Sequence, residues 1–365
     1  MRKALLTLSF LGISVFSVAQ QRMEPGFDSN EYLKILGIFA FSESDTAFSK
    51  GIPMPERVKN IYQSPIVGLE NKWYLWVDEA NKTSYLNIRG TAPNPTSWLA
   101  NFYSAMIPAS GEMQIRSDYT FHYEFSKDPK AAVHIGWTLG TGALAETLVP
   151  KVDSLVKAGY MDFVLTGHSQ GGAITYLMNA HLQNLNQSGK WGSGVRFKTY
   201  SSAAPKPGNL FFAYHYENIT AGGWAFNVVN AADWVPQVPF SIQTVNDFST
   251  TNPFSDASGF IKKQKFPKNL VFKRVYNKLN KPSQKSKDNF QKYLGDFMGK
   301  QVTGTLPDYQ SPEFFNSNHY SRAGNFIILQ PDEEYNTRFP DLKEKTFQHH
   351  MLQPYLFLLK KQYPN

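Results

Sequence analysis

The sequence predicts an α/β fold with a mainly parallel central sheet flanked by helices. Short apolar runs with the composition of β-strands alternate with helix-like segments, a pattern typical of parallel strands joined by helical crossovers. The six runs span residues 72–79, 84–90, 163–167, 195–202, 224–230 and 325–330. The chain contains no cysteine, so neither disulfides nor a cysteine-based zinc site takes part, and core packing must stabilise the fold.

The N-terminal residues have the pattern of an export signal. Two basic residues precede an apolar stretch from Ala4 to Phe16, and residues 17–19 are small, as a signal peptidase requires. The apolar stretch is shorter than the roughly 20 residues that a bilayer span needs, which favours a cleaved signal over a membrane anchor. We therefore expect a signal peptide at 1–19 and one domain at 20–365. The mature chain would have no transmembrane segment and would be secreted or periplasmic.

A helix is predicted between the second and third runs, in the sequence LAETLVPKVDSLVKAGY. Leu144, Leu148 and Leu155 recur at helical spacing, and Gly159 is a typical C-terminal stop. Pro150 lies inside this segment and lacks the backbone N–H that a helix interior uses. We therefore expect a kink or the start of a second helix at Pro150.

The turn after the third run has the layout of a nucleophile elbow. Residues 163–172 read FVLTGHSQGG, and the helix-like sequence AITYLMNAHL follows. Such a turn holds its serine in a strained conformation with the hydroxyl exposed, and the flanking Gly167 and Gly171 let strand and helix approach closely. The helix directs free backbone N–H groups at the place where negative charge develops in acyl transfer. Ser169 is therefore the candidate nucleophile.

Asp233 is the best candidate for an acid that would serve this serine. A serine nucleophile needs a histidine to take its proton and a carboxylate to orient that histidine, and after an elbow the acid precedes the histidine in the chain. Asp233 directly follows the run 224–230 and precedes two prolines that stiffen the loop. Asp247 follows only a short, half-polar run, and Asp256 follows none. The alternative role for Asp233 is that of a turn cap.

Three of the eight histidines, His319, His349 and His350, follow Asp233, so chain order leaves only these as candidate bases. His349 and His350 lie where a loop leads into the amphipathic final helix, and a histidine on such a loop can reach the strand ends. We choose His350, with His349 and then His319 as alternatives. Adjacent residues point in different directions, and the sequence does not show which of His349 and His350 faces inward. Each could instead be a surface or packing histidine. His168 adjoins the serine and is expected to point away.

The oxyanion that forms during acyl transfer needs two hydrogen-bond donors. The backbone N–H of the residue after the nucleophile supplies one, and here that residue is Gln170. The second should come from the loop after the run 84–90, where Thr91 offers a backbone N–H and a hydroxyl just past Gly90. The alternative for this segment is an ordinary glycine-containing turn.

Five short motifs occur in order along the chain. They are Arg89-Gly90-Thr91 followed by Trp98, then Val133-His134-Ile135-Gly136-Trp137, Thr166–Gly172, Pro205-Lys206-Pro207-Gly208-Asn209 and Asp233-Trp234-Val235-Pro236. With a late histidine followed by Tyr355, this set resembles the class 3 lipases, the fungal triacylglycerol lipase-like branch of the α/β-hydrolases. The resemblance implies an α/β-hydrolase fold, with Ser169 as nucleophile, Asp233 as acid, a histidine at 350 and an oxyanion donor at Thr91.

The resemblance also implies a helical lid at residues 98–133, between the oxyanion loop and the V-H-x-G motif. An apolar face at helical spacing runs through Trp98, Leu99, Phe102, Tyr103, Met106 and Ile107. This face would suit a lid that opens onto lipid or, equally, a helix packed on the core. The chain departs from the family at Gln170, where leucine is usual, and at Trp234, where a small residue or proline is frequent.

A basic insertion is expected at about residues 250–315. From Lys262 to Lys300 the chain carries twelve Lys and Arg residues against Asp288 and Asp296, within a chain of net charge +8. This segment could contact anionic surfaces such as lipid headgroups or acidic polysaccharide, or it could be a solvated helix face. The sequence has no motif for binding nucleic acid.

Together these features predict an exported serine hydrolase that cleaves carboxylic esters of lipids through a Ser-His-Asp triad and an acyl-enzyme, without a metal or organic cofactor. A phospholipase A1 and a feruloyl-type polysaccharide esterase would use the same groups. A peptidase is a weaker alternative. A non-catalytic lipid- or glycan-binding protein would keep the fold with the histidine or the acid misplaced.

Overall fold

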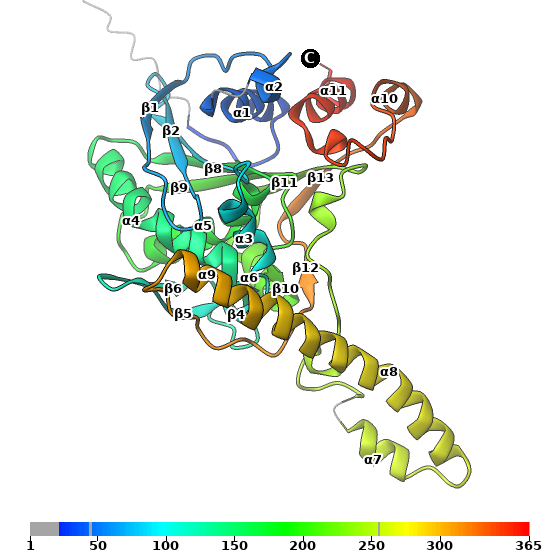
Figure 1. Cartoon of the computed structure of the whole chain (residues 1–365). Helices are drawn as coiled ribbons and strands as arrows, with labels where there is room; N and C mark the ends of the chain where they lie inside the picture. Colours follow the sequence, from blue (N-terminus) through cyan, green and yellow to red (C-terminus); the bar gives the residue numbers. More distant parts are fainter. Residues whose placement is uncertain (1–21, 44–45, 255, 365) are drawn as a thin grey trace, which may run out of the picture.

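The computed structural model describes residues 22–43, 46–254 and 256–364, and a seven-stranded sheet lies at its centre (Figure 1). β1, β2 and β3 pair antiparallel, whereas every pair from β3 to β13 is parallel. In sheet order the strands are β1 (Lys59–Gln63), β2 (Trp73–Asp78), β3 (Thr83–Ile88), β8 (Asp162–His168), β9 (Arg196–Ser202), β11 (Ala225–Asn230) and β13 (Asn325–Leu329). The predicted mainly parallel sheet is confirmed. The signal peptide expected at residues 1–19 lies outside the described residues.

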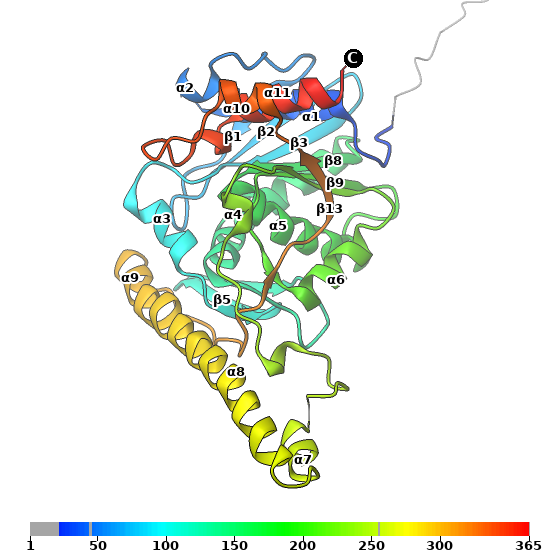
Figure 2. The ribbon, with the colours of Figure 1, turned by 90° about the vertical axis from the view of Figure 1, so that its right-hand side faces the viewer.

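Helices cover both faces of the sheet (Figure 2). α1 (Ser29–Ser42) and α11 (Leu352–Gln362) lie on one face, and α4 (Ile135–Lys157), α5 (Gln170–Gln187) and α6 (Leu210–Ile219) lie on the other. Alternate side chains of each strand point to opposite faces, so Trp73 and Leu75 join the core under α4 and α5 while Tyr74 and Trp76 join the core under α1 and α11. The sheet therefore holds two apolar cores, one on each side.

α4 is one continuous helix of 23 residues, with Pro150 inside it. The expected start of a second helix at Pro150 is therefore wrong. Pro150 lies on the exposed side of α4, whereas Leu148 and Val152 on the buried side pack into the core, and this packing outweighs the loss of one backbone hydrogen bond. The helix ends as predicted, because Gly159 adopts a φ of 85° directly after the cap residue Ala158.

A smaller four-stranded sheet and a hairpin lie below the main sheet in Figure 1. The small sheet has the order β12 (Tyr320–Ser321), β10 (Gly208–Asn209), β7 (Ala132–His134) and β4 (Met106–Pro108), and the hairpin joins β5 (Ser110–Arg116) to β6 (Tyr119–Glu124). The helical face expected from Trp98 to Ile107 is confirmed only in α3 (Pro95–Phe102). Beyond Phe102 it is wrong, because Met106 and Ile107 pair with β7 and are buried there.

The basic segment forms a helical arm that projects from the body of the protein (Figure 1). The arm consists of α7 (Ala257–Lys262) and α8 (Lys268–Gln291), and it continues through a π-helical turn, η3 (Lys292–Phe297), into α9 (Met298–Thr305). The remaining helical elements are α2 (Thr46–Ser49), α10 (Glu333–Arg338) and the 3₁₀ turns η1 (Val235–Gln237), η2 (Val245–Asp247) and η4 (Gln348–His350). Among the residues described, no helix combines the length and the apolar character needed to cross a bilayer.

The buried histidine of α5 predicts a pH-dependent stability. His181 packs against Phe121 with ring centroids 5.0 Å apart, and burial lowers the pKa of His181 to about 4. The unfolded chain binds a proton at this histidine below its ordinary pKa of 6.5, whereas the folded protein does not until about pH 4. The free energy of unfolding is therefore not reduced by His181 above pH 6.5. Below pH 6.5 it falls by about 1.4 kcal/mol per pH unit until about pH 4.

Urea unfolding of the parent and of His181→Leu between pH 7 and pH 4.5 measures this effect. The difference in unfolding free energy between the two proteins should shift by about 2 kcal/mol in favour of the variant between pH 6.5 and pH 5. A pH-independent difference would contradict the lowered pKa, because it would show that the folded protein and the unfolded chain bind a proton at His181 equally well.

Candidate active site

Ser169 lies at the sharp turn between β8 and α5, with φ 61° and ψ −129°. This left-handed conformation is strained for a residue with a side chain and turns the serine out of the strand. The two flanking glycines are sterically required: a Cβ on Gly167 would lie 2.3 Å from the carbonyl carbon of Gly171, and a Cβ on Gly171 would lie 2.1 Å from the carbonyl oxygen of Ile88. The local structure thus has the geometry of the predicted elbow.

Asp233 and His350 form a buried, hydrogen-bonded pair beyond the ends of the parallel strands. Asp233 follows β11, His350 ends the turn η4, and His350 Nδ1 lies 2.7 Å from Asp233 Oδ2. The Tyr355 hydroxyl donates to the same carboxylate oxygen at 2.8 Å, and the Val235 N–H donates to the other at 3.0 Å. Burial opposes the charged form of Asp233, but His350 and these donors together hold the pKa of Asp233 below its usual value. Asp233 is therefore a carboxylate at neutral pH.

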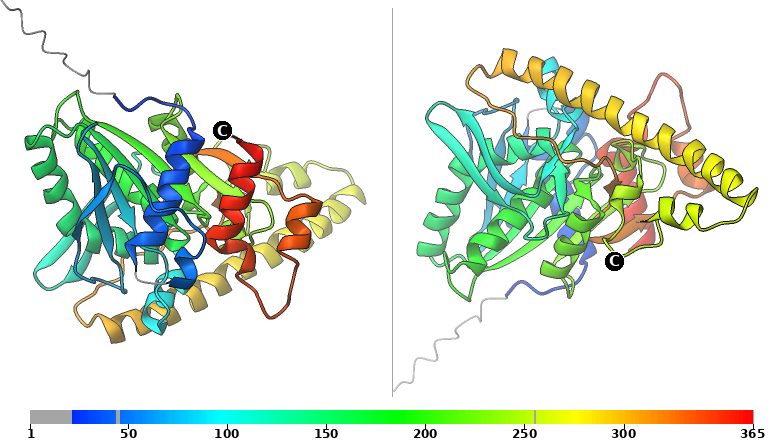
Figure 3. Two further views of the ribbon diagram at one scale, coloured as in Figure 1. Left: turned by 90° about the horizontal axis from the view of Figure 1, so that it is seen from above. Right: turned by 90° about the horizontal axis from the view of Figure 1, so that it is seen from below.

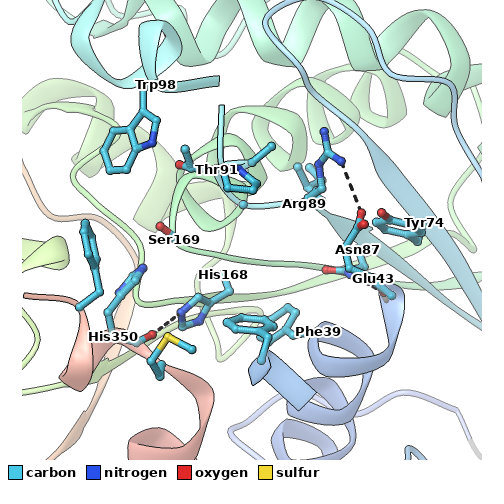
Figure 4. A pocket seen from close by; sticks show the side chains of 18 residues that line it. Phe39, Glu43, Tyr74, Asn87, Arg89, Thr91, Trp98, His168, Ser169 and His350 are labelled. Carbon is cyan, nitrogen blue, oxygen red and sulfur yellow. Dashed lines mark hydrogen bonds and ion pairs between the residues drawn. The ribbon is translucent and has the colours of Figure 1, made fainter. Parts of the chain in front are cut away.

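Ser169 and His350 line the same cavity, which has a volume of about 350 Å³ (Figure 4). We call it the α1-side cavity, because Phe39 and Ser42 of α1 form part of its wall. Figure 4 shows the side chains of Ser169 and His350 at neighbouring positions on this wall, with His168 below Ser169 and beside His350. The structure thus brings the predicted nucleophile, base and acid together from three distant parts of the sequence.

His168 supports His350 from below, a role that the sequence did not indicate. Burial, followed by the charge of His350, lowers the pKa of His168 to about 3, so this imidazole is neutral. His168 Nε2 lies 2.8 Å from the carbonyl oxygen of His350, so Nε2 carries the proton and donates it. His168 Nδ1 must then accept from the Ser202 hydroxyl at 3.0 Å, and the Tyr32 hydroxyl lies 2.6 Å from Ser202 Oγ. A directed chain of buried hydrogen bonds therefore holds the backbone of His350.

The alternative acids and bases lie elsewhere. His349 Nδ1 is 2.6 Å from the Tyr335 hydroxyl and His349 Nε2 is 2.9 Å from Asp341, so both ring nitrogens are engaged away from Ser169. His319 is half-buried and lines neither cavity at Ser169. The two other acids make local contacts: Asp247 accepts from Thr244 and Asp256 caps α7. Of the candidates weighed from the sequence, Asp233 and His350 alone meet at this site.

The two predicted oxyanion donors are joined by one amide side chain. Gln170 is the first residue of α5, so its backbone N–H has no acceptor within the helix, and Thr91 follows β3 on the same wall. Asn101 of α3 donates from Nδ2 to Thr91 Oγ1 at 3.0 Å. Asn101 Oδ1 accepts from Gln170 Nε2 at 2.9 Å and from Trp137 Nε1 at 3.1 Å. Asn101 was not predicted from the sequence, although it stands out as the polar residue in the apolar stretch WLANF.

A second cavity of about 320 Å³ also opens at Ser169, and we call it the α8-side cavity. Both cavities share Thr91, Trp98, Ser169 and Phe347. The α8-side cavity is otherwise mainly apolar, lined by residues that include Phe102, Trp137, Val235, Phe240, Phe290 and Leu294. The far end of the α1-side cavity is more polar, with Asn87, Arg89 and Glu43, and Arg89 lies 3.5 Å from Glu43. Ser169 therefore stands between a mainly apolar space and a partly polar one.

No group of three or more His, Cys, Asp or Glu side chains is placed to hold a metal ion in the described parts of the chain. The polar groups near Ser169 include the imidazole of His350, the carboxylate that it bonds, and the first backbone N–H of α5 at Gln170. Such a set can activate a hydroxyl and stabilise an oxyanion.

The sequence matches known proteins over the region that holds Ser169 and Asp233. A family model described as lipase (class 3) matches residues 85–243. The secreted mono- and diacylglycerol lipase 1 of Fusarium solani is 27% identical over 46% of this chain and 42% of its own length. The secreted mono- and diacylglycerol lipase 3 of Gibberella zeae is 34% identical over 28% of this chain and 29% of its own. The chain thus spans less than half the length of these relatives, and its resemblance to the class 3 lipases is confirmed.

Among solved structures, the Lip2 lipase of Yarrowia lipolytica is similar with a TM-score of 0.44 and 23% identity, over 60% of this chain and 78% of that one. Lipase II of Rhizopus niveus is similar with a TM-score of 0.41 and 25% identity, over 58% and 74% of the two chains. His350 lies outside the region matched by the family model, so only the three-dimensional structure relates it to Ser169.

Proposed function

We propose that this protein is an exported serine hydrolase that cleaves carboxylic esters of lipids, with Ser169 as nucleophile, His350 as base and Asp233 as the acid that orients His350. The observation that carries the proposal is the buried His350–Asp233 pair, 2.7 Å apart, beside a strained serine on the wall of one cavity. The match of residues 85–243 to the class 3 lipases supports the same chemistry.

In the proposed reaction, Ser169 Oγ attacks the ester carbonyl carbon while His350 Nε2 takes the hydroxyl proton. Asp233 accepts a hydrogen bond from His350 Nδ1 and stabilises the imidazolium that forms. Collapse of the tetrahedral intermediate breaks the bond to the alcohol, which leaves with the proton from His350. Water then attacks the acyl-enzyme, gives a proton to His350 and releases the carboxylic acid, and Ser169 regains its hydroxyl hydrogen.

The backbone N–H groups of Gln170 and Thr91 would bind the negative oxygen of each tetrahedral intermediate. Three features support this role: Gln170 begins α5, Thr91 lines both cavities, and Asn101 links the two residues through their side chains. The N-terminus of α5 adds a favourable electrostatic field at the same point.

The shape of the site favours a lipid ester with a neutral alcohol. The mainly apolar α8-side cavity suits an acyl chain, since burial of methylene groups there removes them from water. Near the polar end of the α1-side cavity, Arg89 and Lys72 are balanced by Glu43 and Glu70, at 3.5 to 3.9 Å. This balance provides no net positive charge for a phosphate headgroup, so we propose acylglycerols ahead of phospholipids. The relatives named as secreted mono- and diacylglycerol lipases agree with this preference.

We also propose that the protein acts outside the cytoplasm and that the basic segment Lys262–Lys300 makes peripheral contact with anionic surfaces. The basic and apolar pattern at the N-terminus and the secreted relatives support export. This segment carries twelve Lys and Arg residues and only two Asp residues, and its net positive charge supports attraction to anionic partners.

Two measurements on the purified protein test the proposed function. A fluorophosphonate probe should label the protein at Ser169, because only an activated serine reacts at an appreciable rate. In a panel of mono-, di- and triacylglycerols, phosphatidylcholine and a feruloyl ester, the acylglycerols should be hydrolysed fastest. Absence of labelling would identify a non-catalytic binding protein. Preference for phosphatidylcholine or the feruloyl ester would replace the proposed substrate class while leaving the triad in place.

A further inference from the structure

The first two-thirds of α8 has no contact with a protein core. Within α8, the buried residues are Lys287 and Phe290, near its C-terminal end. There the helix is fastened to the body. Lys287 bonds Asn316, and Gln291 Nε2 donates to the carbonyl oxygen of Phe315 at 2.6 Å. In the π-helical turn that follows, the carbonyl oxygen of Leu294 accepts from the backbone N–H groups of Ser104 and Ala105, between α3 and β4. The N-terminal part of α8 and the whole of α7 therefore extend into solvent, as Figures 1 and 3 show.

An apolar stripe nevertheless runs along this unsupported part. Val271, Val275 and Leu279 recur every four residues and lie on one face of α8, with Phe272 and Tyr276 beside them. Val271, Val275 and Leu279 are 58%, 51% and 71% exposed. Soluble proteins rarely leave a row of large apolar side chains in water unless the row has a partner.

A basic stripe lies next to the apolar one. Arg274, Lys278, Lys281 and Lys285 recur at intervals of four, three and four residues, so they share a face of α8 that adjoins the apolar face. All four are exposed, and none of them takes part in an ion pair among the described residues. A helix with an apolar face and a lysine-rich polar face is the kind that lies in the plane of a membrane interface.

The same helix leads to the proposed catalytic site. Phe290 of α8 and Leu294 of η3 line the α8-side cavity that opens at Ser169. Phe240, on the same cavity wall, is 77% exposed. The arm and one wall of the space proposed for the acyl chain are therefore parts of one helical element that runs through α8 and η3.

We infer that the arm, α7 and α8, is an anchor for an anionic lipid surface. Val271, Val275 and Leu279 enter the boundary between headgroups and acyl chains, and Arg274, Lys278, Lys281 and Lys285 hold the anionic headgroups, with their side chains extending along the interface. Docked in this way, the arm brings the α8-side cavity next to the lipid from which the substrate comes. This last step rests on the proposed function, whereas the binding of the arm to lipid does not.

The partner that covers the apolar stripe of α8 could be a lipid surface or a second copy of the chain, and charge favours the lipid surface. Two arms packed against each other would place their rows of cations side by side, and their repulsion would oppose the contact. An anionic membrane supplies the opposite charge over its whole area and an apolar interior to cover the stripe.

Vesicle binding by the full-length chain tests the inference, with Ser169→Ala as the parent so that no lipid is hydrolysed. The parent should bind phosphatidylcholine vesicles that contain phosphatidylglycerol far more tightly than vesicles of phosphatidylcholine alone, and added salt should weaken the binding. Changing Arg274, Lys278, Lys281 and Lys285 to Gln should weaken binding by about 100-fold or more. Val275→Ser with Leu279→Ser should weaken it by about tenfold or more.

Matched controls separate the arm from general effects of charge and exposure. Lys59, Lys157, Lys343 and Lys360 are also exposed, and changing these four to Gln removes the same charge from other parts of the surface. Ile61 and Ile66 are 52% and 54% exposed, and Ile61→Ser with Ile66→Ser removes apolar area away from the arm. Both controls should bind vesicles within about threefold of the parent, because neither set lies on α8.

The inference is wrong if a control set loses as much binding as its arm counterpart, or if the parent binds both kinds of vesicle equally. It is also wrong if Val275→Ser with Leu279→Ser converts a dimer to a monomer in sedimentation and leaves vesicle binding unchanged, because a second copy would then cover the stripe. In the background that retains Ser169, all arm variants should hydrolyse a short soluble ester at the normal rate. Failure of the parent to hydrolyse that ester would overturn the proposed function and leave the arm result unaffected.

Discussion

Replacing Ser169 by alanine is expected to abolish ester hydrolysis, with kcat on a soluble p-nitrophenyl ester reduced by about 10⁵-fold or more. Ser169 Oγ is the atom proposed to form the acyl-enzyme. Without it, the backbone N–H groups of Gln170 and Thr91 can only bind the substrate. The fold should be unaffected, because alanine keeps the Cβ and therefore adds no steric demand at φ 61°. Initial rates and thermal unfolding of the two proteins measure both parts of this prediction.

Ser188→Ala is the matched control for this experiment. Ser188 is an exposed residue at the other end of α5, and its hydroxyl donates only to the Leu185 carbonyl oxygen. Its turnover should equal that of the unaltered protein. If Ser169→Ala keeps more than a hundredth of the activity while remaining folded, another group carries the reaction and the assignment of Ser169 is wrong.

Replacing His350 and replacing its neighbour His349 are expected to have very different effects on ester hydrolysis. His350→Ala should lower kcat by about 10⁴-fold or more, because His350 is the proposed acceptor of the Ser169 proton and both ring nitrogens of the neighbouring His168 are engaged by Ser202 and the His350 carbonyl oxygen. His349→Ala should retain activity within about fivefold, since both ring nitrogens of His349 are engaged by Tyr335 and Asp341. Its effect should appear mainly as a loss of stability of about 1–2 kcal/mol from the broken hydrogen bonds.

Steady-state kinetics on the same soluble ester, with unfolding in urea, separates the two roles. The two variants differ by one position in one turn and remove the same ring, so a general disturbance of η4 would affect both alike. Equal losses would indicate such a disturbance. A large loss at His349 with activity retained at His350 would reverse the assignment of the base.

The parts of the fold predicted correctly from the sequence are those determined by local rules. The six strands were predicted because each is a short apolar run, and their termini in the structure lie within about two residues of those runs. The elbow was predicted because its two glycines are required at fixed positions around Ser169 by backbone contacts within the same motif.

The predictions that failed concern residues whose conformation depends on distant partners. Met106 and Ile107 continue the helical spacing of α3, but pairing with His134 and Val133 on β7 makes them a strand. The choice of His350 over His349 is a different case: the structure places His350 beside Asp233, but local rules offered little ground for the choice, because it depends on how the turn η4 meets Asp233, which is 117 residues away from His350. The hydrogen bond from His168 to the carbonyl oxygen of His350 joins residues 182 positions apart and was not predicted.

The hydrogen bonds of Asn101 have a consequence for the divergence of related sequences. Because one amide bonds the side chains of both Thr91 and Gln170, the spacing of the two proposed oxyanion donors depends on a single position in α3. Loss of the Gln170 amide would leave Asn101 Oδ1 with Trp137 Nε1 as its donor, and loss of the Thr91 hydroxyl would leave Asn101 Nδ2 without this acceptor. Positions 101 and 170 should therefore change together during evolution, and homologues that carry leucine at 170 should seldom retain asparagine at 101.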